Sequence, residues 1–368
     1  MMRSELSPFP YHGPLEPDEV TGREELVRDL TDRLSERRVT ALLGPRRYGK
    51  TSVLRKVCAD LAGVGQETVW IDLYELSSVA DLAGAIDQGL AKVQGHMRRA
   101  IDSFAGALSL RLGLVGVELS KGRRDRPDPV LTVRSLLEVL VRTAEKHPMI
   151  VVFDEFSGIA NVNHGAAMLR TQLQHHYRTL GIVFAGSQPS TMRMLFTDHA
   201  QPFFAQADLV EIGPLAADAV TMIVQDGFEA TGRSPGGMTS ALVRAAEGHP
   251  QRAMQLADAL WRYTPEGGAA DEAGWVDAVQ DVRANVDGGM ERLFALLPVG
   301  HQKALRAIAA DGRVFGRTAE VLELSPGTAA AAVDSLTGGG HLAKHGDRLV
   351  IIDPLFSDWI RRRFPVPS

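Results

Sequence analysis

The chain has 368 residues, of which 45% are hydrophobic and 23% charged, and its formal net charge is -5. That length is too great for one ordinary core and predicts two or three compact units. The acidic balance excludes a generally basic, nucleic-acid-coating protein, so any contact with DNA must be local.

Cysteine usage and apolar runs restrict the compartment. Cys58 is the single cysteine, which excludes an internal disulfide and a cysteine-rich metal site. The first residues lack the apolar core of a signal peptide, and no apolar run approaches the roughly 20 residues that span a bilayer. We therefore expect a cytoplasmic protein with no membrane contact.

The first predicted elements lead to a glycine-rich loop. Residues 1–21 are rich in proline and predicted to be extended, and Leu26, Leu30 and Leu34 then recur at the spacing of a helix. Residues 39–43 form an apolar run typical of a buried strand, and residues 53–61 have helical periodicity. The order strand, loop, helix argues against a chance match of the pattern between them.

That pattern is G-x-x-x-x-G-K-T, a phosphate-binding loop. Its glycines let successive N–H groups point into one concavity, and the following helix adds its positive end. Lys50 is expected to reach the β- and γ-phosphates of a nucleotide, and the Thr51 hydroxyl to complete the coordination of Mg²⁺. The predicted nucleotide-binding residues of the loop are Gly44, Pro45, Arg46, Arg47, Tyr48, Gly49, Lys50, Thr51 and Ser52.

The chain then alternates strands and helices. A strand is predicted at residues 68–73 and a helix at 79–93, which together indicate a parallel sheet covered by helices. Residues 108–119 alternate apolar with small or polar side chains and predict an inserted strand or hairpin. The basic stretch 121–129 after it is either a solvated loop or a contact loop.

Two acids end the next predicted strand. Residues 149–153 are continuously hydrophobic and are followed by Asp154 and Glu155, the Walker B pattern. Asp154 is expected to hold Mg²⁺ through water opposite Thr51, and Glu155 to orient and deprotonate the attacking water. An acidic pair that merely caps a strand is the alternative, and the phosphate loop about a hundred residues earlier argues against it.

A small polar residue follows another strand. Ser187 ends the predicted strand 181–187, and the carboxyl ends of parallel strands face the nucleotide crevice. Ser187 is therefore either a γ-phosphate sensor or a cap of the next helix. With Lys50 and Glu155 it completes the predicted catalytic set.

These motifs, taken in order, resemble the archaeal-type ATPase family within the AAA+ and STAND P-loop NTPases, and more distantly the origin-recognition ATPases. The residues that carry the likeness are at positions 21–26, 44–52, 153–156 and 185–187, with 353–356 and Trp359 similar to the family's closing motif. The likeness spans nearly the whole chain, and the double arginine in the phosphate loop is its more specific part.

The resemblance implies an α/β fold of three parts. A RecA-like P-loop core with a parallel sheet is expected over residues 1–213, a helical lid over 214–292 and a winged helix over 293–368. Lid helices are predicted at 215–231, 239–247 and 250–263, followed by a linker at 265–270.

The lid carries a further candidate site. Residues 248–250 resemble a STAND lid motif in which His249 approaches the β-phosphate and Pro250 the base. The alternative for His249 is a residue at a helix start with no ligand.

Two departures from the family pattern bear on turnover. Residues 202–206 lack the family's Gly-Arg pair, and Gln251 stands where a second-sensor arginine is common, with Arg252 one position late. Because such a charge can change the rate of phosphoryl transfer by orders of magnitude, these gaps predict slow hydrolysis or a tight nucleotide-bound switch.

The C-terminal part reads as three short helices and a hairpin. The helices are predicted at 301–310, 317–322 and 327–336, and the hairpin strands at 341–344 and 348–352. The third helix, which often enters the DNA major groove in winged helices, offers no cation or amide to base edges. A protein partner or a packing role is therefore as well supported as DNA, and any DNA binding is expected to be weak and independent of sequence.

The sequence predicts an ATP-binding P-loop ATPase with slow, Mg²⁺-dependent hydrolysis that drives a conformational switch. Its ligands are ATP, ADP and Mg²⁺, with Thr51 and Asp154 as metal ligands. The alternative is a nucleotide-dependent regulatory or DNA-binding protein in which hydrolysis is incidental. The guanine motif Asn-Lys-x-Asp of GTPases and the Leu-Ser-Gly-Gly signature of transporter ATPases are absent.

Overall fold

The computed structural model describes residues 6–111, 128–346 and 348–366, and the chain divides into two compact units. The sheet unit comprises Glu24–Gly44 and Lys50–Ile212. The helical unit comprises Met1–Arg23, Pro45–Gly49 and Gly213–Ser368. The sequence-predicted boundaries at 213 and 292 remain a prediction. Among the described residues, no helix is both long and apolar enough to cross a membrane.

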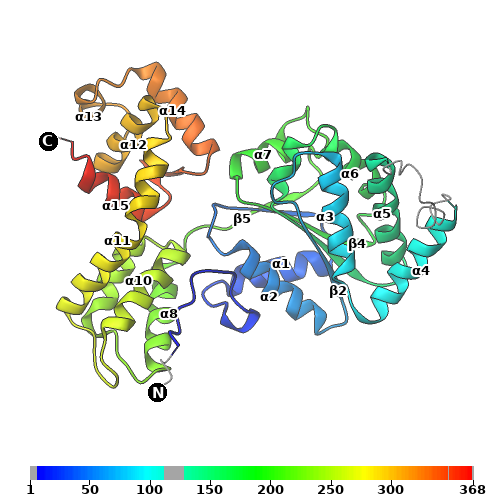
Figure 1. The fold of residues 1–368 in the computed structure, drawn as a ribbon, viewed down its shortest axis with the longest axis horizontal. Coiled ribbons are helices and arrows are strands. Elements are labelled where there is room, and N and C mark those ends of the chain that lie inside the picture. The colour runs from blue at the N-terminus through cyan, green and yellow to red at the C-terminus, as the bar shows by residue number, and fades with distance from the viewer. Residues whose placement is uncertain (1–5, 112–127, 347, 367–368) are drawn as a thin grey trace, which may run out of the picture. The chain divides into compact units, whose positions relative to one another are not determined.

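The sheet unit is built on five parallel strands (Figure 1). They are β1 (Thr40–Leu43), β2 (Glu67–Asp72), β3 (Met149–Asp154), β4 (Leu180–Gly186) and β5 (Asp208–Glu211), in the order β2-β3-β4-β1-β5. Every residue of β1, β3 and β4 is buried, as expected of strands covered on both faces. The α/β fold with a parallel sheet is confirmed.

Helices cover this sheet in two groups. Their bounds are α1 (Glu24–Ser35), α2 (Lys50–Ala62), α3 (Val79–Ala91), α4 (Gly95–Arg111), α5 (Pro129–Ala144), α6 (Gly165–Leu173) and α7 (Pro189–Thr197), with a 3-10 helix η3 at Phe156–Asn161. α1 packs on α2, whereas α5 packs on α3, α4 and α6. Side chains of β1, β2, β3 and β4 meet α3 and α5 in one apolar core.

Five phenylalanines anchor the carboxyl ends of β3 and β4. They are Phe153, Phe156, Phe184, Phe196 and Phe203, each no more than 2% exposed. Neighbouring rings lie with centroids between 4.4 and 6.3 Å apart. This phenylalanine cluster fixes the backbone immediately before and after Glu155, and the backbone just before Ser187.

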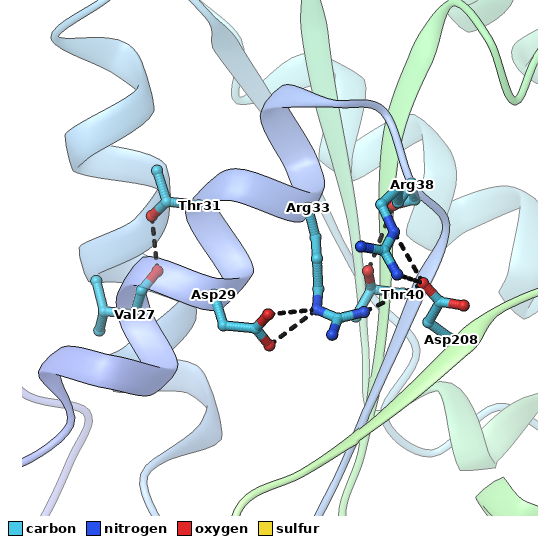
Figure 2. Close-up of polar contacts among 7 residues, drawn as sticks. All are labelled: Val27, Asp29, Thr31, Arg33, Arg38, Thr40 and Asp208. Atoms are coloured by element: carbon cyan, nitrogen blue, oxygen red, sulfur yellow. Dashed lines mark hydrogen bonds and ion pairs between the residues drawn. The ribbon is translucent and has the colours of Figure 1, made fainter.

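An ion-pair network joins the edge strand to α1 (Figure 2). Asp208, the first residue of β5, accepts hydrogen bonds from Arg33 Nη1 at 3.1 Å and Arg38 Nε at 3.0 Å. Asp29 accepts two further bonds from Arg33 Nε, both at 2.8 Å. Because β5 pairs with β1 alone among the described strands, these contacts fix the amino end of a strand that has a partner on one side.

The described residues of the helical unit form mainly helices and one β-hairpin. Its bounds are η1 (Pro17–Glu19), α8 (Ala217–Glu229), η4 (Gly236–Met238), α9 (Thr239–Ala246), α10 (Pro250–Tyr263), α11 (Glu272–Ala295), α12 (Val299–Asp311), α13 (Arg317–Val321), α14 (Pro326–Gly338), β6 (Leu342–His345), β7 (Arg348–Ile351) and α15 (Pro354–Arg363). The lid helices and the three helices with a hairpin follow in the predicted order. β6 and β7 pair antiparallel.

One apolar core runs through this unit. Phe9 of the N-terminal segment is 2% exposed and packs against Phe228 of α8, with ring centroids 5.6 Å apart. At the other end of the chain, Arg283 of α11 binds Asp358 of α15 through two bonds of 3.0 and 2.9 Å. The N-terminal segment, helices α8, α9 and α10, and α15 therefore belong to one packed body.

The structure departs from the sequence prediction in the segment that was expected to be an inserted strand or hairpin. Residues 108–111 were expected in a strand or hairpin but are the last residues of helix α4, and residues 112–119 lie outside the described residues, as do most of 121–129. Short alternation of leucine with polar residues is compatible with a helix end as well as a strand.

Gly89 of α3 tests the packing of helix on sheet. A methyl group at Gly89 would lie 2.7 Å from the Trp70 carbonyl oxygen and 2.8 Å from Ile71 Cγ1. We expect Gly89→Ala to lower the thermal unfolding midpoint by several degrees, because overpacking a core costs about 1–3 kcal/mol.

Gly84 of the same helix is the matched control, because no atom lies within 4 Å of the position where its methyl group would stand. Gly84→Ala is expected to raise the midpoint, since alanine favours a helix interior by about 1 kcal/mol over glycine. Equal midpoints for the two variants would contradict the close approach of α3 to β2.

Candidate functional site

The two predicted magnesium ligands lie together in the sheet unit. Asp154 is the last residue of β3, and Thr51 lies in the first turn of α2, which follows β1 and its loop. Thr51 Oγ1 donates a hydrogen bond to Asp154 Oδ2 at 3.2 Å, although 103 residues separate them. The parallel sheet thus brings the loop helix and the acidic strand end to one edge.

Burial shapes the charge of Asp154. The residue is 7% exposed, and burial raises the pKa of Asp154 to about 6, against the opposing effect of hydrogen bonds from the Glu155 amide and Thr51. A divalent cation would relieve the cost of holding this carboxylate ionised.

One carboxylate and one hydroxyl also match the usual coordination of Mg²⁺ in proteins, in which waters and substrate phosphates supply most of the ligands. Among the described residues there is no cluster of three or more histidine, cysteine or acidic side chains that could form an all-protein metal cage. The donor set therefore suits Mg²⁺ bound together with a nucleotide.

Lys50 lies at the base of the phosphate loop. It is the first residue of α2 and is only 5% exposed. Its Nζ donates a hydrogen bond to the carbonyl oxygen of Gly44 at 2.8 Å. A buried ammonium close to a helix N-terminus can form charge-assisted hydrogen bonds with phosphate oxygens.

Glu155 and Ser187 are hydrogen-bonded to each other. Glu155 has a left-handed backbone (φ 50°, ψ 38°), and its Oε2 accepts hydrogen bonds from the Ser187 hydroxyl and from the Ser187 amide, the latter at 3.3 Å. Gln188, not Ser187, is the N-cap residue of α7, and it makes no side-chain capping bond. Ser187 is therefore bound to the acid of the neighbouring strand and does not cap the helix.

In the helical unit, the middle of the phosphate loop contacts His249, which was expected to belong to a lid motif. Arg47 and Gly49 have positive φ values of 66° and 87°, as a curled loop requires. Tyr48 is 7% exposed, and its ring lies edge-on to the His249 ring with centroids 5.0 Å apart. Burial raises the pKa of Tyr48 to about 12, so the phenol stays neutral. The unit thus joins Tyr48 to the start of α10.

His249 occupies the start of α10. It is the N-cap residue, its Nδ1 accepts a hydrogen bond from the Arg252 amide at 3.4 Å, and Pro250 follows at the first helical position. Burial lowers the pKa of His249 to about 4, so the ring is neutral at pH 7. This position agrees with a residue at a helix start, and the phosphate contact of His249 stays a prediction.

Arg252, one position late in the family pattern, has a partner that sequence reasoning missed. Its Nε and Nη2 donate to the two oxygens of Asp353 at 3.0 and 2.6 Å, and its Nη1 donates to Gln255 Oε1 at 2.6 Å. Asp353 also caps α15 by accepting from the Leu355 amide at 3.0 Å. In the sequence, the pair Asp353-Pro354 indicates the start of a helix, but it does not indicate that Arg252 is the partner of Asp353.

Solved structures share this fold. A Walker-type ATPase of Pyrococcus abyssi matches with a TM-score of 0.72 at 19% identity, over 96% of this chain and 99% of that one. The ORC2 protein of Aeropyrum pernix in its ADPNP-ADP complexes matches with a TM-score of 0.57 at 14% identity, over 96% of both chains. The ORC1 protein of Aeropyrum pernix in complex with DNA matches with a TM-score of 0.50 at 15% identity, over 94% of this chain and 93% of that one.

Comparison with protein-family models and with curated proteins gives no match. The structural likenesses show that the chain has the fold of archaeal Walker-type and origin-recognition ATPases, as the sequence resemblance predicts.

The Arg252–Asp353 pair can be separated from the helix cap. Asparagine caps a helix as well as aspartate does but carries no charge. We expect Asp353→Asn to cost about 3 kcal/mol, because it leaves the guanidinium of Arg252, 5% exposed, without its counter-charge. Thermal unfolding should show a midpoint lower by several degrees.

Asp271→Asn is the matched control, since Asp271 caps α11 through the Gly274 amide at 2.8 Å. The control should be nearly neutral. Arg252 holds the pKa of Asp353 below its ordinary value even though burial opposes this, so the stabilisation is present above about pH 4 and is lost as the pH falls through the folded-state pKa. Equal effects of the two asparagine variants would contradict the ion pair's contribution.

His249 predicts a second pH dependence. Its folded pKa of about 4 lies below the unfolded value, so the unfolded chain binds more protons between about pH 6.5 and 4 and stability falls as the pH falls through that window. His249→Asn keeps a capping side chain and removes the titration. Unfolding midpoints of the unaltered chain and of His249→Asn, measured at pH 7.5, 5.5 and 4.5, should converge at acid pH. Parallel dependence of the two midpoints on pH would show that His249 is not buried in its neutral form.

Proposed function

We propose that the protein is an ATP-binding P-loop ATPase that requires Mg²⁺. The observation that carries the proposal is the hydrogen bond between Thr51 and Asp154 beside the buried ammonium of Lys50. Two polar groups for one metal ion and a cation for phosphates are the parts that phosphoryl transfer needs. The ADPNP-ADP complexes of the structurally similar ORC2 protein support an adenine nucleotide as the ligand.

Each residue has a role in this proposal. Residues 44–52 bind the phosphates, Lys50 contacts the β- and γ-phosphates, and Thr51 and Asp154 hold the metal ion. A bound Mg²⁺ would neutralise negative charge on the phosphate oxygens.

Glu155 takes a proton from water while the water oxygen bonds to the γ-phosphorus and the bond from that phosphorus to the bridging oxygen breaks. The products are ADP and phosphate, and the proton passes from Glu155 to solvent.

We further propose that turnover is slow and serves a conformational switch. The missing arginines support this: Gln251 donates through Nε2 to the Tyr11 carbonyl oxygen at 3.0 Å, and Arg252 is bound to Asp353. Neither side chain offers a charge free to stabilise the transition state. The lid role of His249 and Pro250 belongs to the same proposal.

We propose that the protein binds DNA weakly or not at all. The structurally similar ORC1 protein was solved with DNA, but the exposed residues of α14 include Thr328, Ala330, Ala331, Asp334 and Ser335 and no cation. Any contact with DNA is expected to be weak and independent of sequence. A protein partner for this part of the chain is equally well supported.

Equilibrium binding of ATP to the full chain with Mg²⁺ tests the proposal. Lys50→Ala should weaken binding by about 100-fold, because it removes a buried charge partner of the phosphates. Lys56→Ala is the control on the same helix: Lys56 pairs with Asp60 at 2.7 Å on the surface, so its loss should leave binding unchanged. Retained affinity in Lys50→Ala would refute the site.

Glu155→Gln separates binding from chemistry in the same assay. It should bind ATP as well as the unaltered chain does, while turnover falls by about 10²–10⁴-fold through loss of the general base.

A further inference from the structure

An aromatic contact in the helical unit holds the phosphate loop and has no part in the proposed chemistry. Tyr48 is 7% exposed, and its ring lies edge-on to the His249 ring with centroids 5.0 Å apart. Burial raises the pKa of Tyr48 to about 12 and lowers the pKa of His249 to about 4. Both rings are therefore neutral at pH 7, and neutral aromatic rings favour this edge-on arrangement.

The phosphate loop needs such an anchor. Arg47 and Gly49, on either side of Tyr48, have positive φ values of 66° and 87°. A residue with a Cβ atom, such as Arg47, adopts this conformation only at a cost in free energy, so other contacts must stabilise it. Within residues 45–49, Tyr48 alone is buried. Its ring is thus the group that fixes the curled loop against the helical unit.

The backbone around His249 is itself fixed. The carbonyl oxygen of Gly248 accepts a hydrogen bond from the Leu215 amide at 2.8 Å. Gly248 has φ 72°, and a methyl group there would lie 2.5 Å from the Leu215 carbonyl oxygen. On the other side, His249 Nδ1 accepts a hydrogen bond from the Arg252 amide at 3.4 Å. His249, which is 3% exposed, therefore presents its ring to Tyr48 from a rigid segment.

The first turn of α10 is tied in turn to α15. Arg252 donates to both carboxylate oxygens of Asp353 at 3.0 and 2.6 Å, and Asp353 caps α15. Arg252 is 4% exposed, and hydrogen bonds between charged groups are strong where water is excluded. One series of contacts within the helical unit thus runs from the phosphate loop to the cap of α15 through Tyr48, His249, Arg252 and Asp353.

We propose that Tyr48 is a positioning residue for phosphate binding, and that the Arg252–Asp353 pair acts on the loop through His249. The ring of Tyr48, packed on His249, keeps the loop in the conformation that binds phosphates. The proposal rests on the function proposed above and is separate from the phosphate contact proposed for His249. It makes nucleotide affinity depend on how α15 is attached, and by linkage a bound nucleotide strengthens that attachment.

Equilibrium binding of ATP with Mg²⁺ tests the contact of Tyr48 with His249. Tyr48→Leu stays apolar but loses the ring, so the dissociation constant should rise by about 10-fold, the upper range for an edge-on aromatic pair. Tyr48→Phe keeps the ring and should bind within about 3-fold of the unaltered chain. Phe315→Leu is the control, because Phe315 is 56% exposed, and it should bind ATP unchanged. Unchanged affinity in Tyr48→Leu would overturn the proposal.

A double-mutant cycle shows whether Tyr48 acts through His249. His249→Asn keeps a capping side chain and removes the ring. Tyr48→Leu should therefore weaken ATP binding little further in the His249→Asn background. An equal loss of affinity with and without His249 would show that the ring contact has no effect on binding, contrary to the proposal.

Tripolyphosphate with Mg²⁺ separates positioning of the loop from contact with the base. Tyr48→Leu should weaken the binding of tripolyphosphate and of ATP by the same factor, because the loop contacts phosphates in both ligands. A loss confined to ATP would assign Tyr48 to the base and would likewise overturn the proposal.

Two asparagine variants test the dependence on α15, measured well below their unfolding midpoints. Asp353→Asn removes the charge that holds Arg252, so ATP should bind about 5-fold more weakly. Asp358→Asn is the matched control, because it breaks the other ion pair of α15, with Arg283, and leaves Arg252 untouched. It should bind ATP as the unaltered chain does. Equal affinities of the two variants would refute the coupling to α15.

The two proposals fail in different ways. Absence of ATP binding by the unaltered chain, or full ATP binding by Lys50→Ala, would remove the proposed function itself. Normal ATP binding that depends on Lys50 but not on Tyr48 would remove only the role assigned to Tyr48.

Discussion

The position of β4 between β1 and β3 is the constraint on which the candidate site depends. In a parallel sheet all three strands end at the same edge, so Thr51 after β1, the acids at the end of β3 and Ser187 after β4 lie near one another there. β4 is buried along its whole length and pairs on both sides, which fixes its register. A strand order that did not place β4 beside β3 would separate Ser187 from Glu155.

Polar side chains at this edge of the sheet are buried, which costs desolvation energy but strengthens their interactions with a ligand. Lys50, Asp154 and Ser187 are each no more than 7% exposed, yet each has a hydrogen-bond partner: the Gly44 carbonyl, the Thr51 hydroxyl and the Glu155 carboxylate. Asp154 is held where water stabilises its carboxylate poorly, and this desolvation raises its pKa. The same desolvation strengthens every interaction with an incoming cation or phosphate, so the polar groups are arranged before a ligand binds.

Sequence reasoning reached the parts of this arrangement that local patterns encode. The strand, loop and helix around Lys50 lie within residues 39–61, and the acids at the end of β3 follow a continuous apolar run. The contact of Thr51 with Asp154 could therefore be predicted. The Ser187–Glu155 and Arg252–Asp353 contacts could not, because they depend on how side chains from separate elements meet. Helix α11 was also missed, although its apolar residues Trp275, Val279, Val282, Val286 and Met290 recur every three or four positions.

The partner of Arg252 changes how the missing arginines are understood. A guanidinium that stabilises phosphoryl transfer must be free to approach the phosphates, but all three nitrogens of Arg252 donate to Asp353 or Gln255 in a site where the residue is 4% exposed. Releasing it would leave Asp353, the cap of α15, without its counter-charge. The arginine one position late therefore stabilises the junction of α10 with α15.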